Sequence, residues 1–184
     1  MTSREPPDLS CEDSIGRTYL DAARDQLAKS ARKIKHCLSQ LSDEQVWWRP
    51  TEAQNSIANL VLHLCGNVRQ WITSAVGGEP DQRNRPQEFA ERGPIAMQEL
   101  IGRLEEVLQH ADAVLQRVSA GQLLERRRIQ GFDETGLGAI FHSVAHFQGH
   151  TQEIICLTRM QLGDSYQFDW TPRTSEQQQA ASGQ

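Results

Sequence analysis

Apolar residues recur with the spacing of an amphipathic helix in four long segments of the chain. Within each segment they lie three, four or seven residues apart, and this spacing places them on one face of a helix. The predicted helices span residues 13–41, 55–76, 93–118 and 137–162. Because the chain shows no convincing strand ladder, the pattern predicts an all-α fold, an antiparallel four-helix bundle.

Residues suited to helix termini stand near the ends of these segments. Asn55 or Ser56 can cap the free N–H groups of the second helix, and Gly77 follows its last apolar residue. Pro94 suits the first turn of the third helix, and Gly163 suits the end of the fourth. These residues support the helix boundaries that the apolar spacing predicts.

The predicted links between the helices are long for a bundle. Residues 79–93 contain two prolines and many charges, and loops of that length often carry function. Residues 119–138 are irregular, and the weak alternation in 126–132 could be extended. The stretch from Trp47 to Pro50 is expected to be an extended corner. We therefore expect one or two links to cross the bundle instead of forming tight hairpins.

Composition predicts one globular domain between two loose ends. The chain of 184 residues is long enough for one sizeable core. Residues 1–12 carry prolines and charges and are expected to form a flexible arm, while 171–184 are rich in Gln, Ser and Ala and are expected to form a flexible tail. The bundle domain is thus predicted to span residues 13–170.

The charge balance and hydropathy argue against nucleic acid and membrane partners. The formal net charge is −5, whereas nucleic-acid binding needs a clustered positive surface. The single basic run, residues 126–128, is short and reads as a solvated loop or strand face. No apolar stretch approaches the roughly 20 residues of a membrane span, and the N-terminus lacks the apolar region of a secretory signal. We expect a cytoplasmic protein.

The cysteines predict no disulfide framework. They are far apart and form no CxxC pair, so in a reducing compartment they should be free thiols. Two of them flank the candidate chemistry described next, and we interpret both as small core residues. The four cysteines are Cys11, Cys37, Cys65 and Cys156.

Histidines on the predicted fourth helix have the spacing of a metal site. His142, His146 and His150 are separated by four residues each, so neighbouring rings lie one turn apart and can reach a single ion. All three are not expected to bind the same ion, because the series drifts around the helix. Glu153 follows three residues after His150, where its carboxylate could orient a ligand or a bound water.

The predicted second helix adds a polar line to an apolar face. Asn59, His63 and Asn67 lie one turn apart, and burying them without partners is costly. A metal ion with its water shell would supply those partners. The alternatives are a hydrogen-bonded core histidine at position 63 and a solvated face or helix contact for the HxxxH pair. Histidines on two helices with a carboxylate at a suitable offset favour the metal hypothesis.

Two stretches that contain these residues resemble the DinB-like superfamily of metal-dependent four-helix-bundle proteins. They run from Asn55 to Trp71 and from His142 to Ile154, and the resemblance covers roughly residues 13–165. It implies that His63, His146 and His150 bind the ion, with His142 one turn too early and placed in the adjoining pocket. The family often has Gly-Gln where this chain has Gln152-Glu153, so an acid that could act as a general base or a ligand replaces an amide.

The resemblance also implies a reaction class and an assembly. Its characterised members include thiol-dependent transferases and isomerases, which implies one divalent ion, a low-molecular-weight thiol and a small-molecule substrate. Zinc is the first choice, and nickel or iron would fit three imidazoles nearly as well. A metal-dependent hydrolase is equally consistent, with Glu153 or His142 moving protons. The alternative function is a non-catalytic, stress-related metal-binding or interaction bundle. We expect a homodimer, the commonest arrangement of a soluble homo-oligomer.

Overall fold

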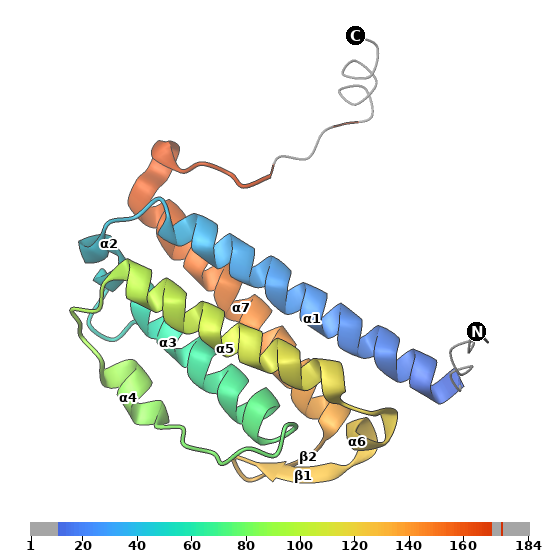
Figure 1. Ribbon diagram of the computed structural model, residues 1–184. Helices are drawn as coiled ribbons and strands as arrows, with labels where there is room; N and C mark the ends of the chain where they lie inside the picture. The colour runs from blue at the N-terminus through green and yellow to red at the C-terminus, as the bar shows by residue number, and fades with distance from the viewer. Residues whose placement is uncertain (1–10, 171–173, 175–184) are drawn as a thin grey trace, which may run out of the picture.

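The computed structural model describes residues 11–170 and 174. The predicted arm and tail therefore lie almost entirely outside the described residues. Within them the all-α prediction is confirmed, because the longest elements are helices packed side by side (Figure 1). These helices are α1 (Cys11–Leu38), α3 (Ile57–Val68) continued by the π-helix η1 (Arg69–Ser74), α5 (Met97–Arg117) and α7 (Gly136–Leu162).

The predicted links contain short elements that the apolar spacing did not reveal. Residues 79–93 include a helix, and residues 119–138 include a helix and a two-stranded hairpin, so neither link is irregular throughout. Trp47 ends another short helix, so the predicted extended corner begins one residue later than expected. The short elements are α2 (Asp43–Trp47), α4 (Arg85–Ala90), α6 (Ala120–Leu124), β1 (Arg126–Ile129), β2 (Phe132–Thr135) and the 3₁₀ turn η2 (Gly163–Ser165).

Two of the neighbouring helix pairs run antiparallel. Between α1 and α5, the guanidinium Nε of Arg24 lies 2.6 Å from Asp112 Oδ1, and Lys35 Nζ lies 2.7 Å from Glu105 Oε1. Residue numbers rise along one helix as they fall along the other. The pair α3 and α7 is also antiparallel, because His63 faces His146, whereas Asn67, further along α3, faces Ser143, which comes earlier in α7.

The other two pairs run parallel. At one end of α1, Tyr19 Oη donates to Leu137 O at 2.7 Å, and at its other end His36 Nε2 lies 2.6 Å from Gln167 O, just beyond α7. Helices α3 and α5 also point the same way, because the link that carries α4 runs back along the bundle (Figure 1). The expectation that a long link crosses the bundle describes this segment.

Serine hydroxyl groups begin several of the helices. The hydroxyl groups of Ser42, Ser56 and Ser119 each accept from the backbone N–H three residues on. The side chain at that later position accepts in turn from the backbone N–H of the serine. These capping boxes satisfy N–H groups that a helix leaves free. At α3 the cap is Ser56 and not Asn55, and the reciprocating side chain is Asn59. The predicted third helix begins later than expected, at Met97.

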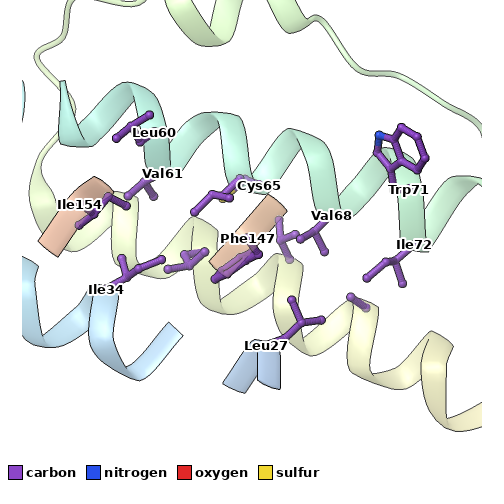
Figure 2. Packing of buried hydrophobic residues seen from close by; sticks show 14 of the residues in the cluster. Leu27, Ile34, Leu60, Val61, Cys65, Val68, Trp71, Ile72, Phe147 and Ile154 are labelled. Atoms are coloured by element: carbon purple, nitrogen blue, oxygen red, sulfur yellow. The ribbon is translucent and has the colours of Figure 1, made fainter. Parts of the chain in front are cut away.

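Helix α3 is covered on several sides, by α5, α7, α4 and α2. Ten of its 12 residues are buried, including residues that would normally face solvent. Figure 2 shows its apolar side chains packed with those of α1 and α7, among them Phe147, which is 0% exposed. A polar side chain on such a helix must find partners inside the protein. This requirement applies to Asn59, His63 and Asn67, which are all buried.

All four cysteines are free, as predicted. Cys65 is a buried core residue, but Cys156 is exposed, so the interpretation of Cys156 as a core residue was wrong. Its position on α7 turns away from the packed face, which the helical period around Ile154 and Leu157 assigns to the core. Among the described residues, no helix combines the length and apolar character that crossing a membrane would require.

Candidate metal centre

Three imidazoles from two helices converge at one place in the bundle. His63 comes from α3, and His146 and His150 come from α7, with one potential ligand atom of each lying within 4.8 Å of the others. His63 Nε2 lies 2.8 Å from His146 Nε2. The three ring planes meet at 75° to 89°, so the rings point toward a common centre instead of stacking. Such a group could hold a metal ion.

Carboxylates occupy the outer nitrogen of two of these rings. Glu88 Oε2 lies 2.8 Å from His63 Nδ1, and Glu153 Oε2 lies 2.7 Å from His150 Nδ1. A carboxylate can only accept, so each Nδ1 carries the hydrogen and each Nε2 is left with its lone pair. This is the usual orientation of metal-binding histidines, whose second nitrogen donates to a carboxylate or carbonyl group.

Glu88 itself is held by a buried arginine. Arg83 Nε donates to Glu88 Oε1 at 2.7 Å, and Arg83 Nη2 donates to Oε2 at 2.9 Å. The two side chains are only 3% and 10% exposed. Burial opposes ionisation of Glu88, but the hydrogen bonds from Arg83 and His63 outweigh it and lower the pKa of the carboxyl group. The group therefore faces His63 as a carboxylate.

Burial lowers the pKa of three of the histidines at or beside the site, His63, His142 and His146. Burial lowers the pKa of His63, and it lowers the pKa of His146 to about 3 with a further contribution from the charges of His150 and His63. Burial also lowers the pKa of His142. Neutral imidazole is the form that binds metals, so His63 and His146 are ready to do so at neutral pH.

His142 lies beside the three converging rings. Its ring stacks on the indole of Trp71, with centroids 3.8 Å apart and planes inclined by 23°. On its other side it lies nearly parallel to His146, with centroids 5.7 Å apart. A stacked ring offers its face and not a nitrogen lone pair to its neighbour. The structure thus places His142 next to the cluster and outside the group of atoms that converge.

The buried asparagines bind protein groups. Asn59 Nδ2 donates to the carbonyl groups of Glu88 and Glu91, each at 3.0 Å, and so ties α4 to α3. Asn67 Oδ1 accepts from Ser143 Oγ at 2.9 Å. The sequence interpretation, in which an ion and its water shell supplied these partners, was therefore wrong for both asparagines. It also missed Arg83 and Glu88, whose only signal was a charged link of unusual length.

The arrangement of the helices defines the class of the protein. The chain is similar to a conserved protein from Enterococcus faecalis, with a TM-score of 0.63 and 14% identity over 76% of this chain and 95% of that one. It is also similar to a DinB-like protein from Bacillus cereus, with a TM-score of 0.59 and 14% identity over 72% of this chain and 85% of that one. The fold is that of the DinB-like helical proteins, as the sequence resemblance implied.

The family follows from the sequence match. Residues 14–175 match the family described as "Protein of unknown function (DUF1572)", and the chain belongs to this family, which is DinB-like. No curated protein matches the chain.

Proposed function

We propose that this protein binds one divalent metal ion through His63, His146 and His150 and acts as a metal-dependent enzyme on a small-molecule substrate. The observation that supports the proposal is the convergence of three imidazoles within 4.8 Å of one another. The carboxylates on His63 and His150 strengthen it, because they turn both Nε2 atoms toward the centre. Zinc is the first choice, with nickel and iron as alternatives for the same donors.

The donor count favours a catalytic site over a structural one. Among the described residues, the group of converging ligand atoms has three members, whereas structural zinc sites are closed by four protein ligands. A bound ion would lower the pKa of a water molecule or a thiol in its remaining position. That chemistry suits a thiol transferase, a thiol-dependent isomerase or a hydrolase.

The residues around the three imidazoles would have separate tasks. Glu153 would orient His150 through the 2.7 Å contact with Nδ1. His142, stacked beside His146, would accept or donate a proton during the reaction. A reacting thiol would come from outside the chain, because Cys65 is buried and burial raises its pKa to about 12. A low-molecular-weight thiol is thus the second expected component.

Metal analysis of the purified protein tests the proposal. We expect about one divalent ion per chain, retained in the His142→Ala protein and lost from the His63→Ala, His146→Ala and His150→Ala proteins. A screen for thiol transfer and for hydrolysis, with several cellular thiols, would then separate the reaction classes. Wild-type protein without a bound ion after incubation with zinc, nickel or iron would contradict the proposal.

A further inference from the structure

The link between α3 and α5 brings the carboxylate of Glu88 against His63 of α3. We propose that Glu88 is a positioning residue that fixes the orientation and tautomer of His63. Arg83 holds its carboxylate, and Gly66, which has no side chain, leaves room for it. This inference rests on the proposed function of His63 as a metal ligand, and it gives the crossing link a task in building the site. None of the three residues touches the converging Nε2 atoms, so none is a catalytic residue.

Gly66 provides the passage for the carboxylate. A Cβ atom at this position would overlap Glu88 Oε1 and would lie 2.7 Å from Glu88 Cδ and 3.0 Å from Arg83 Nε. Glycine inside a helix costs about 1 kcal/mol relative to alanine, and position 66 lies inside α3. Any other residue here would force the Glu88 carboxylate away from its position beside His63, because Glu88 crosses the helix surface at this point. Gly102, inside α5, has open space around it and serves as a contrast.

Arg83 fixes the carboxylate through hydrogen bonds to both of its oxygens. Its two bonds to Glu88 are a bidentate pair, and Gln70 Oε1 accepts from its third nitrogen, Nη1, at 2.9 Å. Asp81 Oδ1 accepts from the backbone N–H of Arg83 at 3.0 Å. Arg83 Nη2 also lies 3.1 Å from His63 Nδ1. Since guanidinium cannot accept a hydrogen bond, only Glu88 can take the hydrogen from Nδ1.

The surroundings explain why His63 needs this partner. Arg83 and Glu88 form part of the wall of a cavity of about 510 Å³ between α3, η1, α5 and the link. Without the Glu88 side chain, water in this cavity would reach His63 Nδ1. Water donates as readily as it accepts, so the hydrogen of His63 would be shared between Nδ1 and Nε2. A hydrogen on Nε2 blocks the lone pair that an ion requires.

Zinc affinity and the tautomer of His63 together test the inference. Zinc alone is the probe, titrated into the full chain against a chromophoric chelator. We expect Glu88→Ala to weaken zinc binding about 10- to 100-fold, with Glu88→Gln in between because its amide oxygen still accepts. Glu79→Ala is the matched control, since Glu79 lines the same cavity but pairs with His110, 2.7 Å away. It should change the affinity less than about twofold.

The glycine variants test the passage. Gly66→Ala should weaken zinc binding by a factor similar to that of Glu88→Ala, and the double variant should be no weaker than either single one, because both remove the same contact. Gly102→Ala should leave zinc binding unchanged. Thermal unfolding identifies a Gly66→Ala protein that fails to fold, and in that case Glu88→Ala and Glu88→Gln decide the question.

Nitrogen-15 spectra of the metal-free protein give a readout that does not depend on zinc. We expect the hydrogen of His63 on Nδ1 in the wild type and a mixture of tautomers in Glu88→Ala. Wild-type protein that shows this tautomer but binds no zinc would overturn the proposed function and support the positioning role. Wild-type zinc binding with unchanged affinity and tautomer in Glu88→Ala would overturn the positioning role alone.

Discussion

An ion held by residues of α3 and α7 should raise the thermal stability of the bundle. Such an ion would bind the folded chain, in which His63 Nε2 lies 2.8 Å from His146 Nε2, and not the unfolded chain, in which the two residues are far apart. At a free zinc concentration a hundred times Kd, this linkage stabilises the fold by about 2.7 kcal/mol. For a chain of this size that corresponds to a rise in Tm of about 5–11 °C.

His146→Ala should abolish most of this rise. The three rings form a triangle, with centroids 4.9 Å apart for His63 and His146, 4.5 Å for His146 and His150 and 5.1 Å for His63 and His150, so loss of His146 removes one of three equivalent ligands. If affinity falls about 100-fold, the same zinc concentration stabilises by only about 0.4 kcal/mol, a shift of about 1–2 °C. His142→Ala is the matched control on the same helix and should keep the full shift.

Scanning calorimetry with and without zinc measures this shift in each protein. The difference within one variant cancels the direct effect of the substitution on Tm. A His142→Ala protein that loses the shift, beside a His146→Ala protein that keeps it, would show that the ligand register is wrong by one helical turn. Equal shifts in the wild type and both variants would place zinc elsewhere on the chain.

Further predictions concern the neighbours of the site and the core. Glu153→Ala should weaken zinc binding in the same chelator competition, but less than Glu88→Ala does, because Glu153 is about half exposed and water can replace it at His150. Phe147→Ala should lower the free energy of unfolding by about 3–5 kcal/mol in urea titrations, and a loss below about 1 kcal/mol would contradict its place in the core. Cys156 should react with iodoacetamide before Cys65, whose pKa is raised from 9.0 to about 12 by burial. Because the folded state holds that proton more tightly, the stability contributed by this thiol should be lost as pH rises above 9.0, which unfolding at pH 8 and pH 10 would measure.

The long helices could be predicted from the sequence because each buries one face. A repeated apolar spacing survives small errors at the ends, so α1 and α7 were found to within a few residues. The helix α4 has only six residues and contributes no apolar residue to the core, so it carries no such spacing. The parallel run of α3 and α5 was likewise absent from the pattern, since periodicity describes each helix alone.

The same limit applies to the candidate site: spacing within one helix could be predicted from the sequence, but contacts between distant segments could not. The spacing of His146 and His150 on one helix is a local property, and the sequence shows it directly. The contact of Glu88 with His63 joins a link to a helix 25 residues away, and it depends on the path of the link across Gly66. A sequence pattern does not show the path of the link or whether the Glu88 side chain can contact His63. The partners of Asn59 and Asn67 were missed for the same reason.

The place of α7 in the bundle determines how late in its synthesis the protein can fold. This helix packs against both α1 and α3, and of the described long helices it is the last to leave the ribosome. The chain lacks Phe147 and two of the three converging imidazoles until residues 146–150 have emerged, and α7 is complete only at residue 162. The nascent chain should thus stay sensitive to protease up to that length. Protection and the histidine cluster should arise together, after synthesis of the bundle is complete.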